Sequence, residues 1–239
     1  MAASNSTETR DTSRTASRRN RRIAIGAQEL SLALVSESSE DRRAVEQSIM
    51  QKFERAYGAH LTHFLPDLLK LGTADELGAV AGIRAARKEA LFLEQYLDRP
   101  VEQAVARAFK TPVDRDSIVE IGNLAANVPG YAYTLFAALA TILARAGFRW
   151  VVCTATPQVA SMLSRMGLSA RAICRADPSL LEADAADWGD YYASGPRVMA
   201  GDVQLAARQV VMNSEIARQI DELYWPITQM AATLGKASR

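Results

Sequence analysis

The sequence predicts an α/β (α+β) fold, in which a central, mixed and twisted sheet is flanked by helices. Segments with the alternating pattern of strands are interleaved along the chain with segments of helical period. In addition, residues 117–166 read as strand, helix, strand and helix, an order that implies parallel strand pairing through a right-handed crossover. With 239 residues, 49% of them apolar, the chain can bury a substantial core.

Composition divides the chain into a disordered basic tail (1–26), one α/β domain (27–210) and a C-terminal helical extension (211–239). The first 22 residues are rich in Ser and Thr and carry six Arg against two acidic residues, which is typical of a disordered segment. This tail lacks the apolar stretch of a secretory signal, so we expect a cytoplasmic protein. Two cysteines are too few for a disulfide framework. The net charge of +1 gives no reason to expect a nucleic-acid partner.

Strand and helix patterns alternate in the first part of the chain. Residues 29–36 (ELSLALVS) have the composition of a strand. Apolar residues recur at helical spacing over 42–57, and Gly58 is placed to end that helix. The apolar segment 59–71 is expected to be a second short helix or an irregular loop, because Pro66 interrupts it.

The middle of the chain continues the alternation. Residues 76–86 are small and alternating enough for a strand. Helical patterns follow at 89–97 and at 100–109, the latter opened by Pro100. The next three elements are a strand at 117–125, a helix at 131–145 and a strand at 149–155.

The helix predicted over 157–166 has signals at both ends: Thr156 as N-cap, Pro157 at the first position and Gly167 as C-terminal cap. After it we expect a strand at 169–175, a loop with short helical turns at 178–195, a strand at 197–206 and a helix at 213–233 that Pro226 kinks.

Two further expectations concern apolar segments. No charged side chain lies between Glu120 and Arg145, but two Asn residues and a Pro-Gly pair interrupt this run, and its helical part is too short for the roughly 20 residues that a bilayer requires. We therefore expect a core helix and no transmembrane segment. Near the C-terminus, Tyr224, Trp225 and Ile227 are candidates for a homodimer interface.

The stretch from Ser117 to Ala144 is the most informative, because it joins a strand with a lone carboxylate, Glu120, to an apolar helix through the Pro129-Gly130 turn. Such a turn presents backbone N–H groups to an anionic ligand. The alternative is that the turn merely connects a strand to a helix.

This stretch resembles the core of the GNAT-type N-acetyltransferase superfamily, whose turn reads Gln/Arg-x-x-Gly-x-Gly/Ala. Here the turn is Asn127-Val-Pro-Gly130-Tyr-Ala132, with Asn at its first position. Within that superfamily the chain resembles the thermostable hemolysin family over most of residues 30–205. The segments that carry this resemblance are FLEQYLDRPVEQAVA (92–106), IVEIGNLAA (118–126), GFRWVVCTATP (147–157) and WGDYY (188–192).

The resemblance extends distantly to acyl-homoserine-lactone synthases, which carry a similar Glu-bearing strand followed by Arg three residues on; Asn123 stands there in this chain. It implies a GNAT-like fold and an acyltransferase that moves an acyl group, including a fatty acyl group, from a coenzyme A or acyl-carrier-protein thioester to a small-molecule amine. The thioester would be a co-substrate, with no permanently bound cofactor and with acyl carrier protein as a candidate partner. The implied donor-binding residues are Leu124, Ala125, Asn127, Val128, Gly130, Tyr131 and Ala132.

Glu120 is the candidate catalytic residue, because a desolvated carboxylate on a largely apolar strand suits a general base. An ion pair with Arg84 or Arg99 is an equally good interpretation. Asn123 either positions a substrate carbonyl or satisfies a loop. By the same resemblance, the candidate residues for an acceptor or carrier-protein surface are Arg84, Tyr96, Asp98, Arg99 and Glu102, although charged helical clusters are commonly solvated faces.

Several residues favour structural roles. Trp188, Tyr191 and Tyr192 cover the core or close over an acyl chain. His60 and His63 have no further ligand at metal-binding spacing, so no metal site is expected. Two other functions stay open: a membrane-active hemolysin without enzymatic activity, which the absence of a long amphipathic basic helix disfavours, and a degenerate acyl-thioester-binding module.

Overall fold

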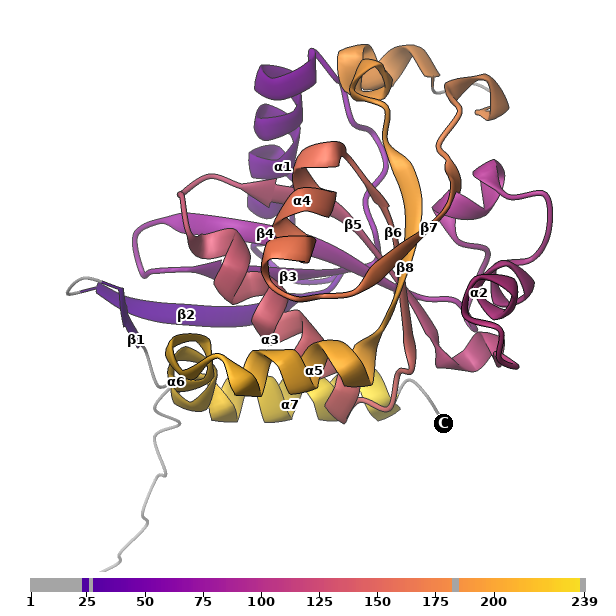
Figure 1. Cartoon of the computed structure of the whole chain (residues 1–239). Helices are drawn as coiled ribbons and strands as arrows, with labels where there is room; N and C mark the ends of the chain where they lie inside the picture. The colour runs from indigo at the N-terminus through magenta and orange to yellow at the C-terminus, as the bar shows by residue number, and fades with distance from the viewer. Residues whose placement is uncertain (1–22, 26–27, 182–184, 237–239) are drawn as a thin grey trace, which may run out of the picture.

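The computed structural model describes residues 23–25, 28–181 and 185–236. Its strands form one sheet in the order β1-β2-β3-β4-β5-β6-β8-β7 (Figure 1). β5 and β6 are parallel, as the sequence predicts, and the other neighbouring pairs in the described part are antiparallel. The strands are β1 (Ile23–Ile25), β2 (Gln28–Val35), β3 (Asp67–Gly72), β4 (Leu77–Ala85), β5 (Ile118–Ala126), β6 (Trp150–Ala155), β7 (Ala170–Arg175) and β8 (Arg197–Asp202).

Helices cover both faces of the sheet (Figure 1), and each face carries one cluster of buried apolar residues. One face carries α3, α5, α6 and α7, and the other carries α1, η1, α2 and η4. The α-helices are α1 (Arg42–Tyr57), α2 (Val101–Phe109), α3 (Tyr131–Arg145), α4 (Pro157–Arg165), α5 (Val203–Met212), α6 (Ser214–Glu222) and α7 (Tyr224–Lys236). The 3-10 helices are η1 (Phe92–Tyr96), η2 (Arg115–Ser117), η3 (Pro178–Leu180) and η4 (Ala185–Ser194).

Helices with clear end signals lie where the sequence places them. α1 ends at Gly58, which has a left-handed φ of 65° and donates its N–H to the carbonyls of the last turn. The Thr156 hydroxyl caps α4 by accepting the Val159 N–H, and Gly167 follows with φ 73°. α3 spans the residues expected from the apolar stretch.

The segment 59–71 was predicted to be a short helix or a loop, but its last part belongs to a strand, because Asp67–Gly72 forms β3. β3 lies between β2 and β4, with Leu69 opposite Leu34 on one side and Ala81 on the other. The prediction was wrong because a short apolar run gives no periodicity that separates a buried strand from a helix.

The C-terminal elements also differ from the expectation. The strand predicted over 197–206 ends at Asp202, whose carboxylate accepts the Leu205 N–H and caps α5. The predicted helix 213–233 is two helices that separate at Leu223. Pro226 lies in the first turn of α7, where the missing N–H costs nothing, and therefore introduces no kink.

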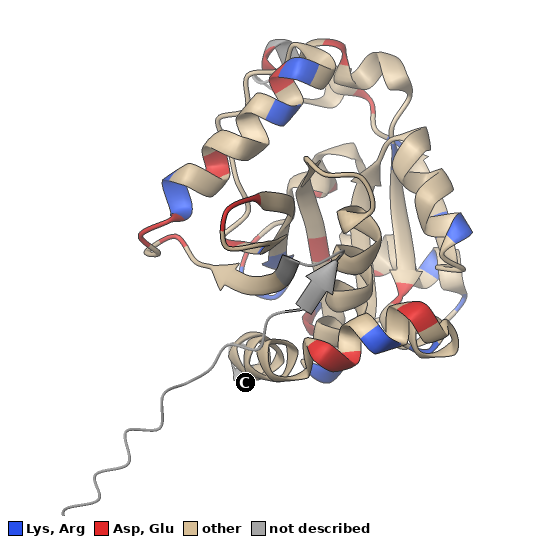
Figure 2. Cartoon of the chain, turned by 90° about the vertical axis from the view of Figure 1, so that its left-hand side faces the viewer, with Lys and Arg blue, Asp and Glu red and all other residues tan. Residues whose placement is uncertain are grey.

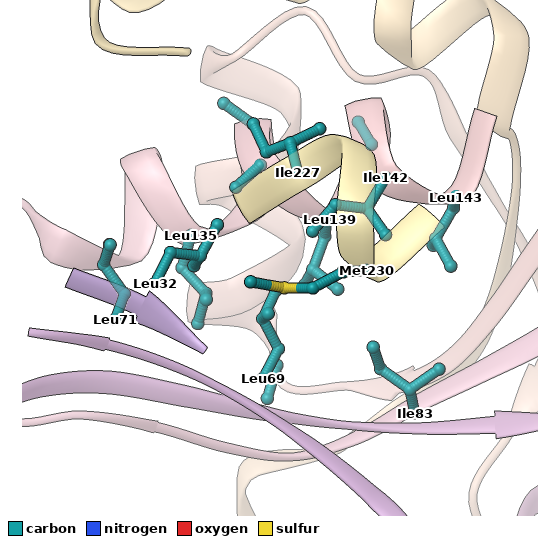
Figure 3. Packing of buried hydrophobic residues seen from close by; sticks show 14 of the residues in the cluster. Leu32, Leu69, Leu71, Ile83, Leu135, Leu139, Ile142, Leu143, Ile227 and Met230 are labelled. Carbon is teal, nitrogen blue, oxygen red and sulfur yellow. The ribbon is translucent and has the colours of Figure 1, made fainter. Parts of the chain in front are cut away.

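The expected extension is continuous with the core. Ile227 and Met230 of α7 lie against Leu139 and Ile142 of α3 (Figure 3), and Ile227 is fully buried. Ile227 is therefore not available for subunit pairing, unlike the exposed side chains of Tyr224 and Trp225.

The expected basic tail falls largely outside the described residues, which exclude 1–22 and 26–27. Ile23–Ile25, assigned to the tail from the sequence, forms β1 and pairs with β2. Elsewhere residues of both charges are mixed on the surface (Figure 2), and α1 carries Glu46 and Glu54 among its Lys and Arg residues.

Two irregularities of β5 shape the centre of the sheet. β5 pairs with β6 from Ile118 as far as Ile121, opposite Cys153, and beyond this point the two strands separate. On its other edge, β5 carries a bulge in its pairing with β4. Gly122 lies opposite Gly82 and Ala125 lies opposite Val80, so β5 has two residues where β4 has one. A gap in the sheet therefore opens beside the second half of β5.

Candidate active site

A cavity of about 180 Å³ lies where β5 and β6 separate. Glu120 and Asn123 of β5 line it together with Thr154 of β6. Aromatic residues of α1, η1 and η4 close it on one face of the sheet, and Phe136 of α3 and Val159 of α4 line it on the other. The cavity thus connects the two faces through the gap.

Glu120 is the buried carboxylate of this cavity, with a residue exposure of 4%. Its two oxygens accept the backbone N–H groups of Phe92 and Leu93, both at 3.0 Å, at the start of η1. Burial raises the pKa of Glu120 to about 7, although the two N–H donors and the positive charge of Arg84 oppose this shift. Glu120 can therefore accept a proton near neutral pH.

A salt-bridge network fixes η1, the element that holds Glu120. The Glu94 carboxylate accepts the N–H groups of Leu91, at 2.8 Å, and Val101, at 3.1 Å. Arg115 binds both Glu94 oxygens, at 2.8 and 2.7 Å, and also contacts Glu102 at 3.0 Å. This pairing with Arg115 lowers the pKa of Glu94 to about 2. Glu102 therefore serves this network and does not line the cavity.

Arg84 and a tyrosine pair complete the polar end of the cavity. Arg84 is the cross-strand neighbour of Glu120 on β4, and its Nε lies 3.1 Å from a Glu89 oxygen. The hydroxyls of Tyr96 and Tyr192 are hydrogen-bonded at 2.5 Å, and burial raises the pKa of both phenols. Glu120 and Arg84 are therefore close enough to act on one ligand.

Asn123 has the role of a loop anchor. It adopts a left-handed backbone conformation with φ 47° within the β5 bulge. Its side-chain oxygen accepts the Leu65 N–H at 2.8 Å, and its amide nitrogen donates to the His63 carbonyl at 3.4 Å. This amide holds the segment before β3 against β5, while the residue also lines the cavity.

The turn before α3 is tied to β4. The N–H groups of Asn127 and Val128 donate to the Gly78 carbonyl at 2.8 and 3.1 Å, and the Asn127 amide donates to Ser48 and to the Leu77 carbonyl. These two N–H groups are thus engaged within the protein. Gly130, with φ 91°, is the N-cap residue of α3 and provides no side-chain cap. The N–H groups of Tyr131 and Tyr133 donate to the carbonyls of Val128 and Gly130, at 3.4 and 3.1 Å.

The structure brings together only part of the residues predicted for the site. Leu124, Arg84 and Tyr96 line the cavity with Glu120 and Asn123. Ala125 is buried in the apolar cluster beneath α1. Asp98 and Arg99 pair with each other at the surface, at 2.8 and 2.9 Å, and do not line the cavity.

Sequence reasoning missed the wall that α1 contributes. Phe53 and Tyr57 lie one turn apart on α1, and their rings contact Tyr191 of η4, at centroid distances of 6.2 and 5.2 Å. Trp188, Tyr191 and Tyr192 line the cavity as well as cover the core. The sequence does show aromatic residues four positions apart in one helix and a cluster of them in WGDYY. Only the tertiary structure shows that these two segments are in contact.

Cys153 lines the same cavity. Burial, together with the nearby Glu120, raises the pKa of its thiol to about 12. A protonated thiol is a poor nucleophile, so Cys153 is not a candidate nucleophile.

A second, smaller cavity of about 70 Å³ adjoins the first. Ile121, Phe136 and Cys153 line both cavities and separate them. The second cavity is apolar and extends between the sheet and α3, where Leu139 and Ala140 line it. The two cavities are therefore neighbours, the first with Glu120 at its polar end and the second largely apolar.

Two further features concern the described residues alone. They contain no group of three or more His, Cys, Asp or Glu side chains placed to hold a metal ion. None of their helices combines the length and apolar character needed to cross a membrane.

The fold is similar to those of solved acyl-transferring enzymes. FeeM, an N-acyl amino acid synthase from uncultured soil microbes, is 13% identical with a TM-score of 0.55, over 78% of this chain and 96% of that one. The AHL synthase LasI is 12% identical with a TM-score of 0.51, over 75% and 95% of the two chains. BjaI, a CoA-dependent acyl-homoserine lactone synthase solved with SAM and isopentyl-CoA, is 13% identical with a TM-score of 0.50, over 79% and 90%. At such identity the likeness establishes the GNAT-like fold, which confirms the fold prediction.

The sequence itself matches the family model described as thermostable hemolysin over residues 35–207. This match confirms the family resemblance found in the sequence. No curated protein sequence matches the chain significantly.

Proposed function

Because the chain belongs to the thermostable hemolysin family and has a GNAT-like fold, we propose that it is an acyltransferase acting on a thioester donor and an amine acceptor. The observation that carries this proposal is Glu120, a buried carboxylate with a pKa of about 7 in the cavity between the diverging strands β5 and β6. Such a group is matched to the removal of a proton from an ammonium near neutral pH.

The gap beside β5 is the proposed donor site. From Gly122 onward, the edge of β5 that faces β6 has no partner strand among the described residues, so its backbone can pair with the amides of a pantetheine arm. The N-terminus of α3, which follows Gly130 and has no side-chain cap, is the proposed binding site for phosphate. The apolar second cavity suits the acyl chain. Both coenzyme A and acyl carrier protein carry a phosphopantetheine arm, so this site can accept either donor.

The proposed reaction needs one base at the position of Glu120. Glu120 removes a proton from the acceptor ammonium, and the resulting amine attacks the thioester carbonyl carbon. A C–N bond forms, and the tetrahedral intermediate collapses by breaking the C–S bond. The departing thiolate takes up the second proton of the nitrogen, and Glu120 releases its proton to solvent.

The test is an assay of purified protein with panels of acyl-CoA and acyl-ACP donors and a mixture of small amines, followed by free thiol and by mass spectrometry of acylated products. We expect acceptor-dependent thiol release that falls at least 100-fold in Glu120→Gln, as expected for loss of general base catalysis of roughly 10²–10⁴. Asp98→Asn is the matched control, because Asp98 is exposed and outside the cavity. Donor binding without any release would indicate a binding module and would contradict the proposal.

The family description supplies a second candidate function, lysis of membranes. We propose that any lysis by this protein arises from an amphiphilic acylated product. Purified protein should then lyse erythrocytes or lipid vesicles only when donor and acceptor are present. Lysis by the protein alone, undiminished in Glu120→Gln, would instead support a directly membrane-active protein.

A further inference from the structure

The polar end of the cavity holds two opposite charges side by side. Arg84 and Glu120 are register partners on the antiparallel strands β4 and β5, so their side chains lie on the same face of the sheet. Both line the cavity, in which the Arg84 side chain is 19% exposed.

Arg84 is only loosely engaged by the protein. Its ion-pair partner in the described part of the chain is Glu89, whose side chain is 50% exposed. The buried Nε of Arg84 lies 3.1 Å from Glu89 but has no hydrogen bond of acceptable geometry within the described residues. The Glu89 side of this ion pair is exposed to solvent, which weakens the pair, so a ligand carboxylate can compete with Glu89 for the guanidinium.

We propose that the acceptor is an α-amino acid with a large apolar side chain, and that Arg84 binds its carboxylate while Glu120 receives the proton of its ammonium. This inference rests on the acyl transfer proposed for the same cavity. It adds the class of acceptor and assigns Arg84 the selection of a carboxylate.

The spacing of the two side chains fits this ligand. Cross-strand neighbours have Cβ atoms about 5 Å apart, and the ammonium and carboxylate of an α-amino acid are attached to one carbon. A guanidinium also offers two parallel N–H groups to a carboxylate. An acceptor amine that lacks a carboxylate cannot accept these hydrogen bonds. An acceptor with a second positive charge would be repelled by Arg84.

The surroundings define the acceptor side chain. Phe92, whose N–H binds Glu120, has its ring 5.6 Å from Trp188 and 6.2 Å from Tyr96. These rings line the cavity next to the charged pair. They offer an apolar surface to a side chain such as that of leucine or phenylalanine.

The test compares acceptors that differ by the carboxylate alone. L-phenylalanine and L-leucine are assayed against phenethylamine and isopentylamine, their decarboxylated counterparts, with the best donor of the panel. We expect wild-type kcat/KM to be at least tenfold higher for the amino acids. Arg84→Gln also removes a charge that lowers the pKa of Glu120, so it should lower kcat/KM for both kinds of acceptor to some extent. For the amino acids the loss should be at least tenfold larger than for the two amines, mainly through KM.

Two variants make the result specific. Arg84→Lys keeps the charge but loses the two-pronged contact, so it should recover part of the preference even if Arg84→Gln folds poorly. Lys88→Gln removes one positive charge just after β4, at an exposed position outside the cavity, and should leave the preference unchanged.

A wild-type enzyme that acylates the amines as well as the amino acids would overturn this inference and leave the proposed acyl transfer intact. Equal losses for both acceptors in Arg84→Gln would also overturn it. If no acyl transfer occurs, calorimetric titration with L-phenylalanine separates the two proposals: binding that Arg84→Gln abolishes supports the carboxylate site, and absence of binding overturns it.

Discussion

At the scale of single residues, the site depends on a buried carboxylate, Glu120, whose ionised form is stabilised by hydrogen bonds from backbone N–H groups. Glu120 loses hydration by burial, and two η1 N–H groups return part of that stabilisation to its ionised form. This balance leaves its pKa at about 7, whereas the pKa of Glu94 is held at about 2 by Arg115. The two carboxylates thus carry different average charges near pH 7, because Glu94 is hydrogen-bonded directly to a guanidinium whereas Glu120 is buried and hydrogen-bonded to backbone N–H groups.

The raised pKa of Glu120 predicts how stability depends on pH. Between its ordinary value of 4.5 and about 7, the folded state binds more protons at this site than the unfolded state, so stability falls as pH rises through this window. Over the full window the loss is about 3 kcal/mol. We expect Glu120→Gln to remove this fall, measured by urea unfolding at a series of pH values. Other groups titrate equally in both proteins, so an unchanged pH slope in the variant would contradict the prediction.

Glu94 is expected to position Glu120 through η1. Glu94→Gln weakens the contact with Arg115 and loosens the N–H groups that favour the ionised form of Glu120. These N–H groups lower the pKa of Glu120 more than the negative charge of Glu94 raises it, so the net effect is a higher pKa. We expect the midpoint of the pH profile of kcat/KM to move upward and kcat at pH 7 to fall roughly tenfold, about the equivalent of one hydrogen bond. Asp98→Asn, at an exposed ion pair, is the control and should change neither. A fall in rate without a shift of the pH midpoint would indicate a purely structural role.

At the scale of elements, the site exists because β5 pairs with different strands along its length. Its first half pairs with both β4 and β6, and its second half pairs with β4 alone. α3 then returns along the sheet and lines the apolar second cavity. One strand and one helix therefore build both the proposed donor site and the proposed acyl site.

The second cavity is expected to set the acyl length. Ala140→Leu enlarges a nearly buried residue of α3 that lines it. We expect kcat/KM for long-chain donors to fall roughly tenfold or more, a loss of about 1–3 kcal/mol, while short-chain donors are unaffected. The measurement is a chain-length series with Ala140→Leu beside Thr141→Ser, at the next position of α3 and outside both cavities. An equal loss for all chain lengths would show that this cavity does not hold the acyl chain.

At the scale of the whole molecule, the C-terminal helices complete one core with α3 and the sheet. Leu223 and Ile227 are fully buried, and Met230 and Leu234 lie in the same cluster as Leu135 of α3. Because α3 forms a wall of the site, removal of this packing would also disturb the cavity.

Ile227→Ala is therefore expected to lower the free energy of unfolding of the whole protein by about 2–5 kcal/mol, since it leaves a cavity in a packed core. Val211→Ala, at a position 73% exposed, should change it by less than about 0.5 kcal/mol. Urea unfolding followed by circular dichroism measures both. If residues 211–239 formed an independent extension, Ile227→Ala would leave the main transition unchanged.

Several features could be predicted from the sequence because they depend on local signals. Gly58 and Thr156 mark helix ends through their own backbone and side-chain chemistry. β5, α3 and β6 were recognised from hydrophobic pattern, and Glu120 from its place on an apolar strand. By contrast, β3 was missed because its burial comes from two neighbouring strands that are distant in the chain.

The sequence by itself determined the fold class, the family and the candidate base, since each rests on patterns that neighbouring residues carry. The tertiary structure decided which residues share the cavity. It set Arg84 beside Glu120, brought the aromatic rings of α1 to those of η4, and moved Asp98, Arg99 and Glu102 away from the site. The physical reason is that strand register and helix packing join segments far apart in the chain, and no local pattern encodes those distances.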